Sequence, residues 1–174
     1  NIFRENVVIN RATYKDGETR IGNRNFFMEG VHVSHDTKIL NYCTFGYGTK
    51  VAGDCEIANG VMFSSGVIIN PEVRIGGGTM ITSGVRISKD VPPFIVATHN
   101  PVTYGGLNIN LLKASGTDEK VIAHIANAYR LLFHGKTATH DAIRQIKEQV
   151  PESKEIRILI NFLENTKLDV ITKI

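Results

Sequence analysis

The sequence predicts a mainly β fold: a parallel β-helix over residues 1–96, followed by a small α-helical subdomain over residues 97–174. Two observations support this prediction. Large apolar residues recur at every sixth position from Ile21 to Ile87, and the pair Pro92-Pro93 ends the repeat where the composition changes. A chain of 174 residues fits one domain with an appended subdomain.

Each six-residue unit has two inward positions. One holds a large apolar residue, and the other, two residues earlier, is small or β-branched in the units that follow Asn25. Residues two apart lie on one face of a strand, and the polar or glycine residues between units suit sharp turns. Amphipathic helices and hairpin meanders lack a strict period of six, whereas hexapeptide β-helices have it. The large apolar residues are Ile21, Phe27, Val33, Ile39, Phe45, Val51, Ile57, Phe63, Ile69, Ile75, Ile81 and Ile87.

Three such repeats form one triangular coil, so residues eighteen apart are expected to stack. Stacked coils satisfy each other's backbone groups, and each coil buries the apolar face of the next. The predicted ladders contain Phe27, Phe45, Phe63 and Ile81 in one set and Ile21, Ile39, Ile57 and Ile75 in another.

The start of the chain departs from this register. Ile2 and Val8 are also six apart, but the register changes between Val8 and Ile21. We therefore expect a loop at about residues 13–20, either a solvated excursion or a cover over a substrate. The chain begins at Asn1 in a strand-like run without an initiator Met, so we expect that an N-terminal part is missing.

The tail is expected to be helical, because two prolines remove ladder donors and stop the last strand. A crossing loop is expected over residues 100–116. The expected helices run from Thr117 or Asp118 to about His134, with a stop at Gly135, and near residues 139–149 and 153–166. The apolar stripe of the first helix contains Val121, Ile125, Ala128 and Leu132.

Composition and charge exclude several classes of protein. No apolar stretch reaches the length of a membrane span, and the first residues carry charges, so we expect a cytoplasmic protein without membrane insertion or a signal peptide. Cys43 and Cys55 are too few for a disulfide framework and lack metal-ligand spacing, which favours core positions. The net charge of +3 does not indicate a nucleic-acid partner.

His32 and His35 flank the inward Val33, and Asp36 follows directly. Both histidines are therefore expected at outward or corner positions, as solvated surface residues or as part of a site. A metal site is the weaker functional alternative, because the spacing places no third ligand. A γ-class carbonic anhydrase, which is a β-helix with the same kind of repeat, needs further histidines at spacings that this sequence does not contain.

Several segments resemble the UDP-N-acetylglucosamine acyltransferase family in order and spacing, and the similarity covers nearly the whole chain. They are Gly30-Val31-His32-Val33-Ser34-His35-Asp36, Val51-Ala52-Gly53, Asp90-Val91-Pro92-Pro93-Phe94-Ile95-Val96-Ala97, Gly106-Leu107-Asn108 with Leu112-Lys113, and Asn127-Ala128-Tyr129-Arg130. The resemblance implies left-handed coils and an acyl carrier protein-dependent O-acyltransferase of lipid A biosynthesis.

The resemblance assigns His35 as the general base. An imidazole takes a proton from a sugar hydroxyl as that oxygen attacks an acyl thioester, then returns it to the leaving thiolate. Asp36 either orients His35 and stabilises its cation or simply forms a corner turn. Gly53 matches the position whose backbone N–H stabilises the tetrahedral oxyanion, and the need for a permissive backbone at a corner explains the same glycine.

By the same resemblance His32 contacts the sugar nucleotide and Asn108 binds the nucleotide, although an ordinary loop asparagine explains Asn108 equally well. Met80 and Ser83 fall where the family lines its acyl groove. A glycine at the second of these positions lets a long chain pass in the best-known members, so Ser83 predicts a shorter acyl group.

The implied acyl donor is acyl carrier protein, whose phosphopantetheine arm carries the acyl group, and the implied acceptor is a nucleotide sugar. No metal or redox cofactor is implied. The resemblance also implies a closed homotrimer with each active site between two subunits. A cyclic trimer is a standard closed assembly.

The chain departs from the family at positions that contact the substrate. A histidine is replaced by Asp54, a glutamine by Pro71, a second histidine by Pro101, a glutamate by Asn110 and an arginine pair by Ala114 and Ser115. Losing the arginine pair removes a bidentate phosphate clamp. The sequence therefore leaves acyl-chain length, O- versus N-acylation and three functions open: an acyltransferase for UDP-N-acetylglucosamine, an acyltransferase for another acceptor such as an amino sugar, and a non-catalytic β-helix scaffold or binding protein.

Overall fold

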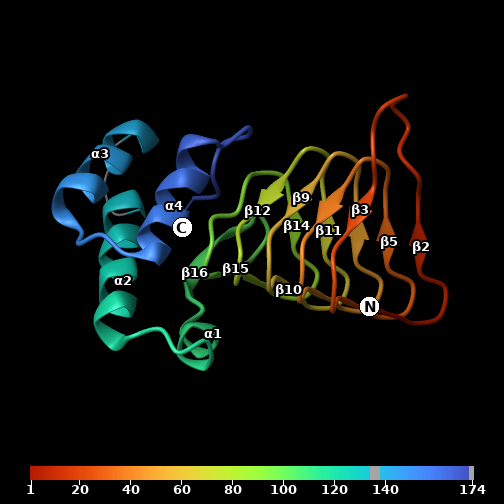
Figure 1. The fold of residues 1–174 in the computed structure, drawn as a ribbon, viewed down its shortest axis with the longest axis horizontal. Coiled ribbons are helices and arrows are strands. Elements are labelled where there is room, and N and C mark those ends of the chain that lie inside the picture. The colour runs from red at the N-terminus through yellow and green to blue at the C-terminus, as the bar shows by residue number, and fades with distance from the viewer. Residues whose placement is uncertain (134–137, 173–174) are drawn as a thin grey trace.

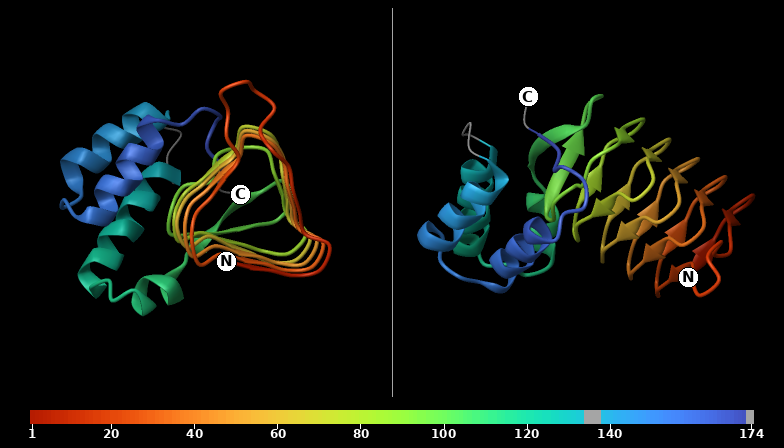
Figure 2. Two further views of the ribbon diagram at one scale, coloured as in Figure 1. Left: turned by 45° about the vertical axis from the view of Figure 1, so that its right-hand side comes forward. Right: turned by 90° about the horizontal axis from the view of Figure 1, so that it is seen from above.

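The computed structural model describes residues 1–133 and 138–172 and contains a β-helix with a group of helices at its C-terminal end (Figure 1). Seen along their axis, the coils superimpose as triangles whose sides are parallel sheets (Figure 2). The first sheet contains β1 (Ile2–Phe3), β4 (Phe26–Phe27), β7 (Thr44–Phe45), β10 (Met62–Phe63) and β13 (Met80–Ile81). The second contains β2 (Val8–Ile9), β5 (His32–Val33), β8 (Lys50–Val51), β11 (Ile68–Ile69) and β14 (Arg86–Ile87). The third contains β3 (Arg20–Ile21), β6 (Lys38–Ile39), β9 (Glu56–Ile57) and β12 (Arg74–Ile75).

The predicted stacking of residues eighteen apart is confirmed. Phe27 pairs with Phe45, and Phe45 with Phe63, with ring centroids 4.6 Å and 4.8 Å apart. The isoleucine ladder from Ile21 to Ile75 pairs in the same way on the third sheet. Each of the strands β1 to β14 has only two residues, so the backbone bonds between coils and the buried ladders, rather than any single strand, hold the prism together.

In the inward series of small or β-branched residues Asn25 is the exception, and its hydrogen bonds explain why it is tolerated. Asn25 is fully buried, its Oδ1 accepts from the Cys43 N–H at 2.7 Å, and its Nδ2 donates to the Leu40 carbonyl at 2.9 Å. Cys43 and Cys55 are free core residues, as expected, and burial raises the pKa of their thiols to about 11 and about 12. The buried amide of Asn25 is tolerated because the Leu40 carbonyl and the Cys43 N–H satisfy it inside the prism.

The first coil has a different register from the one that Ile2 and Val8 suggest. Phe3 pairs with the inward Phe27, and Ile9 pairs with the inward Val33, so Ile2 and Val8 point outward. The expected change of register is therefore wrong: Phe3 and Ile9 share the six-residue register of Ile21, and the loop between Ile9 and Ile21 adds one whole six-residue unit. A loop follows at residues 10–19, which begins somewhat earlier than the predicted one and separates β2 from β3.

Three corners join the sheets. The first corner, between the first and second sheets, contains the turns at residues 28–31, 46–49, 64–67 and 82–85. The second corner, between the second and third sheets, contains the loop at residues 10–19 and the turns at residues 34–37, 52–55 and 70–73. The third corner, between the third and first sheets, contains the turns at residues 22–25, 40–43, 58–61 and 76–79.

The beginning of the tail is more regular than expected. β15 (Ile95–Thr98) pairs parallel with β13, and β16 (Thr103–Leu107) pairs antiparallel with β15, so the first sheet continues beyond the prolines. The predicted boundary at residue 96 therefore falls inside β15, and the expected crossing loop contains β16 and α1 (Ile109–Ala114). That expectation is wrong because pairing to β13 is a tertiary contact, which local sequence does not encode.

The longer helices agree better with the sequence. They are α2 (Glu119–Phe133), α3 (Thr139–Gln149) and α4 (Lys154–Glu164). The Ser153 hydroxyl caps α4 by accepting from the Ile156 N–H at 3.2 Å. Of the predicted stripe, Ile125, Ala128 and Leu132 are buried and Val121 is half-buried, whereas the predicted stop at His134 and Gly135 lies outside the described residues. No helix in the described part of the chain has the length and apolarity that crossing a membrane requires.

A cluster of charged residues joins the tail to the third sheet. Glu56 accepts hydrogen bonds from Arg74 Nε at 2.9 Å and from Lys167 Nζ at 2.8 Å. The Arg74 guanidinium also lies over the Phe162 ring of α4, 5.0 Å from its centroid. The buried Asp90 carboxylate accepts from the backbone N–H groups of Arg74 at 2.8 Å and Lys167 at 3.0 Å. Residues far apart in the sequence therefore fix the tail against the prism.

Candidate active site

The second corner brings three of the predicted site residues together. His35 and Asp36 lie in the turn that follows β5, and Gly53 lies one coil further along at the same corner. The loop of residues 10–19 projects from this corner (Figure 2). This grouping follows from the triangular coil, which superimposes residues eighteen apart.

The His35 imidazole is bound on one edge by a carboxylate and a hydroxyl. His35 Nδ1 lies 2.9 Å from Asp36 Oδ2 and 3.2 Å from Thr13 Oγ1. Thr13 donates to the same Asp36 oxygen twice, from its N–H at 2.9 Å and from its hydroxyl at 2.8 Å. The His35 side chain is 38% exposed and that of Asp36 only 6%, so the imidazole is accessible and its carboxylate partner is covered.

The environment of Asp36 favours its ionised form. Burial opposes ionisation, but hydrogen bonds from the Thr13 N–H, the Thr13 hydroxyl and His35 outweigh burial and lower the pKa of Asp36 below its ordinary value. An ionised Asp36 accepts a hydrogen bond from the Nδ1–H of His35 and stabilises a cationic imidazole. Of the two explanations for Asp36, this geometry supports an orienting role. The same residue also forms the turn, since its φ is 59°.

Gly53 lies directly under the His35 ring. A Cβ atom at Gly53 would lie 2.6 Å from His35 Cε1 and 2.7 Å from His35 Nε2, closer than real Cβ atoms approach. The φ of Gly53 is not in the left-handed region, which at this turn is occupied by Asp54 with a φ of 60°. Backbone freedom therefore does not explain this glycine, and the close approach of the imidazole does.

The backbone N–H of Gly53 has no acceptor within residues 1–133 and 138–172, whereas its carbonyl accepts from the Glu72 N–H at 3.1 Å. An amide hydrogen next to an imidazole is the kind of donor that stabilises a developing oxyanion. Thr13 and Tyr14 are the residues at this corner that the sequence did not single out. The Tyr14 hydroxyl lies 3.5 Å from Asp54 Oδ2, and the Asp54 charge is the main cause that raises the pKa of Tyr14.

The other predicted site residues lie elsewhere on the prism. His32 is on the outward face of the second sheet, in β5, where it pairs with Val8 and Lys50. Met80 is on the first sheet, paired with Met62 and Val96, and Ser83 is an exposed residue of the first corner. Within one chain, therefore, the proposed acyl-groove residues and the His35 cluster occupy different corners.

Asn108 has a structural role next to the third corner. Its Oδ1 accepts from the Leu111 N–H at 3.4 Å and caps α1, and its Nδ2 donates to the Gly78 carbonyl at 3.0 Å. These bonds attach the first helix of the tail to the prism. The predicted nucleotide-binding role of Asn108 remains a prediction, and these two bonds use about half of the hydrogen-bonding capacity of its side chain.

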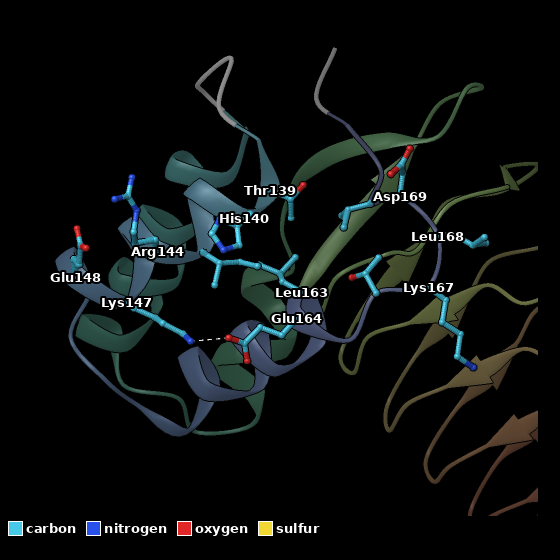
Figure 3. Close-up of a pocket in the computed structure, with 13 residues that line it drawn as sticks. Thr139, His140, Arg144, Lys147, Glu148, Leu163, Glu164, Lys167, Leu168 and Asp169 are labelled. Atoms are coloured by element: carbon cyan, nitrogen blue, oxygen red, sulfur yellow. Dashed lines mark hydrogen bonds and ion pairs between the residues drawn. The ribbon is translucent and has the colours of Figure 1, made fainter.

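A pocket of about 740 Å³ lies in the tail between α3, the end of α4 and the segment at residues 166–170, and it contains none of the predicted site residues (Figure 3). It combines both signs of charge: Lys147 Nζ lies 2.6 Å from Glu164 Oε1. Across the described residues, no three His, Cys, Asp or Glu side chains are grouped to hold a metal ion. His32 and His35 thus lack a third ligand in this part of the chain.

Comparison with known proteins agrees with the resemblance in the sequence. Residues 90–171 match the family described as Udp N-acetylglucosamine O-acyltransferase; Domain 2. The chain is 54% identical over 167 residues to the acyl-[acyl-carrier-protein]–UDP-N-acetylglucosamine O-acyltransferase of Sulfurihydrogenibium sp. (strain YO3AOP1), covering 95% of this chain and 62% of that protein. The identity is 39% over 173 residues to the enzyme of the same name from Syntrophobacter fumaroxidans, covering 98% of this chain and 67% of that protein.

Solved structures give the same result. The UDP-N-acetylglucosamine acyltransferase from Bacteroides fragilis superposes with a TM-score of 0.88 and 32% identity over 97% of this chain and 78% of that one. The enzyme from Francisella novicida superposes with a TM-score of 0.94 and 28% identity, over 99% of this chain and 63% of that one. The chain spans 62% of the length of its Sulfurihydrogenibium relative. By sequence identity, coverage and fold, the chain belongs to the acyl-[acyl-carrier-protein]–UDP-N-acetylglucosamine O-acyltransferase family.

Proposed function

We propose that the protein containing this chain transfers an acyl group, such as a 3-hydroxyacyl group, from acyl carrier protein to a hydroxyl of UDP-N-acetylglucosamine or a similar nucleotide sugar. The observation that carries this proposal is the His35 imidazole, bound by the buried Asp36 at 2.9 Å and packed over Gly53. The scaffold alternative does not explain why a covered carboxylate and an accessible imidazole pack together over a glycine that leaves no room for a side chain.

The proposed reaction gives each of these groups a defined role. With Nδ1 protonated and bound to Asp36, His35 Nε2 takes the proton of the sugar hydroxyl as its oxygen attacks the thioester carbonyl carbon. The tetrahedral intermediate then carries a negative oxygen, to which the Gly53 N–H donates. The carbon–sulfur bond breaks, and the imidazolium returns its proton to the phosphopantetheine thiolate of the carrier protein. No electron is gained or lost, so this transfer needs no redox cofactor.

The proposal extends to an assembly. Met80 and Ser83 lie on the first sheet and first corner, whereas His35 lies at the second corner, so we propose that a neighbouring copy brings the acyl-groove residues to His35. We therefore include in the proposal a homotrimer with its active sites between subunits. The proposal also includes a cytoplasmic location, as the sequence leads us to expect. In this assembly His32 contacts the sugar nucleotide, and a shorter acyl group is favoured because Ser83 replaces a glycine.

A related acceptor is the second candidate. Asp54 places a carboxylate beside Gly53, with its Oδ2 3.5 Å from the Tyr14 hydroxyl, where the family resemblance leads us to expect a histidine. A carboxylate there favours an acceptor that presents a hydrogen-bond donor or a cationic amine. An amino sugar satisfies this condition. Its ammonium group first loses a proton, the neutral amine attacks the thioester carbon, and the second proton passes through His35 to the leaving thiolate, so the products are an amide and the carrier thiol.

The test is a mass-spectrometric transfer assay of the full-length protein with acyl carrier protein donors of several chain lengths and a panel of UDP-sugars, including an amino sugar. We expect one acylated sugar nucleotide, and His35→Ala should lower its rate at least about a hundredfold while keeping the circular-dichroism spectrum of the parent. A variant as active as the parent would refute His35 as the base. Failure with every acceptor would favour the scaffold, and preference for long acyl chains would refute the role of Ser83.

A further inference from the structure

We infer that the loop of residues 10–19 is a positioning element for the general base, in which Thr13 holds Asp36 and selects the His35 tautomer with an unprotonated Nε2. This inference rests on the proposed function and deepens it. Thr13 is a positioning residue, since it acts on the sugar hydroxyl only through Asp36 and His35.

The direction of the Thr13 hydrogen bonds carries the argument. A hydroxyl has one hydrogen, and at 2.8 Å from the ionised Asp36 Oδ2 the Thr13 hydroxyl donates it to the carboxylate. The Thr13 oxygen therefore turns only lone pairs toward His35 Nδ1, 3.2 Å away. Asp36 Oδ2, at 2.9 Å from the same nitrogen, is also an acceptor. Both neighbours of Nδ1 are acceptors, so Nδ1 carries the hydrogen and Nε2 is left as the base.

The rest of the loop is built around the same carboxylate. The Asp36 N–H donates to Thr19 Oγ1 at 2.9 Å, and a Cβ at Gly17 would lie 2.2 Å from Asp36 Oδ1. Within the described residues, Asp36 Oδ1 is buried and has no hydrogen-bond partner. The loop thus excludes water from one carboxylate oxygen and concentrates the hydrogen bonds on the other, which faces Thr13 and His35. Desolvation of this kind strengthens the interaction between the carboxylate and an imidazolium.

The coil itself does not require this insertion. At the same corner the turns at residues 52–55 and 70–73 join the second and third sheets without a longer loop. Apart from Glu18, which pairs with Arg20, the side chains from residues 10–19 that form hydrogen bonds within the described part of the chain bond at this corner. The loop is mostly exposed to solvent, but its hydrogen bonds give it a structural role at this corner beyond that of a solvated excursion.

The experiment compares Thr13→Val with Thr13→Ser in the full-length protein, with the parent and His35→Ala alongside. Valine has nearly the shape of threonine and keeps the backbone N–H, but it lacks the hydroxyl, whereas serine keeps the hydroxyl. We expect Thr13→Val to lower kcat roughly tenfold, as for one lost hydrogen bond to a charged group, with KM within about twofold of the parent. Thr13→Ser should restore kcat to within about threefold of the parent.

A second measurement reports on the tautomer without relying on activity. In ¹⁵N spectra of the histidine ring nitrogens, neutral His35 of the parent and of Thr13→Ser should carry its hydrogen on Nδ1, and Thr13→Val should show a smaller share of this tautomer. Equal kcat values and equal spectra for the parent and Thr13→Val would overturn the inference, as would a rise in KM with kcat unchanged. If His35→Ala is as active as the parent, the proposed function fails instead, and the spectra still decide whether Thr13 selects the tautomer.

Discussion

The first and second corners of the prism use the same backbone turn for different purposes. At the first corner the residue with positive φ is Asn6 in the first coil, at 58°, and a glycine in the four coils that follow: Gly30, Gly48, Gly66 and Gly84, at 67° to 71°. At the second corner the equivalent residues are Asp36, Asp54 and Glu72, at 59° to 65°. A left-handed conformation is unfavourable by roughly 1–2 kcal/mol for residues with a Cβ.

This difference in residue type shows which corner of the prism carries backbone strain. A Cβ at any of the four first-corner glycines would meet no atom within 4 Å, so these glycines serve the backbone alone. The second corner instead carries carboxylates at the strained positions, next to His35 and the inserted loop. Strained residues that the surrounding structure holds in place are typical of functional sites. Gly53, at the second corner, is a glycine for space rather than for conformation.

The largest expected effect comes from filling that space. In Gly53→Ala the new Cβ displaces the imidazole, and a misplacement of roughly 1 Å is expected to lower kcat/KM about a hundredfold. The free energy of unfolding should change by less than about 1 kcal/mol, because the φ of Gly53 is open to alanine. The mass-spectrometric assay and urea unfolding measure the two quantities. Full activity in this variant would contradict the position of His35 over Gly53.

The matched control lies at the first corner. Gly48→Ala should lower the free energy of unfolding by about 1–2 kcal/mol, since its φ of 67° disfavours a Cβ. Its activity at a temperature where it is folded should equal that of the parent. A catalytic defect in folded Gly48→Ala would remove the distinction between the two corners.

The reverse substitution sharpens the same distinction. Glu72 has a φ of 65° and an exposed side chain, so Glu72→Gly should raise the free energy of unfolding by about 0.5 kcal/mol as the strain is relieved. Glu72→Ala, which keeps a Cβ, is the control and should not gain stability. Urea midpoints for the two variants measure the effect, and a loss of stability in the glycine variant would argue against strain at this corner.

The smallest effect is a pH dependence. Because the folded-state pKa of Asp36 is lowered, its ionised form stabilises the fold above the ordinary pKa, and this contribution is lost as pH falls through the lower folded-state value. Asp36→Asn should therefore be less stable than the parent at pH 7, and the difference should shrink in acid. Unfolding midpoints from pH 7 to pH 3 test this, with His35→Ala as the background so that the neighbouring imidazole does not titrate. A difference independent of pH would contradict the prediction.

Much of the fold could be predicted from sequence because its interactions repeat. Inward positions recur every six residues and stack every eighteen, as Phe27, Phe45 and Phe63 do. The period alone therefore predicts the ladders and the corners. The bounds of α3 and the Ser153 cap of α4 were accessible for a similar reason, since both depend on neighbours within a few residues. β15 and β16 were not, because they are strands only by pairing with an existing sheet edge.

Part of the candidate site could likewise be predicted from the sequence, and part of it could not. His35, Asp36 and Gly53 could be selected from the resemblance, and the eighteen-residue stacking places them at one corner. Thr13 was missed, although a usable signal existed: Ile9 and Ile21 are twelve residues apart, so one extra six-residue unit is inserted as a loop in the coil directly before His35. The missing step was to stack the loop as well as the strands.

The sequence by itself determined the period, the inward residues and the corner at which an imidazole and a glycine meet, because a six-residue repeat permits few ways to bury its apolar positions. Only the tertiary structure decided that Gly53 is required for space and Asn108 for capping, and that Thr13 shares the Asp36 carboxylate with His35. These facts depend on contacts between side chains from different coils or from the tail. Such contacts have no fixed spacing in the sequence, so a repeat pattern cannot encode them.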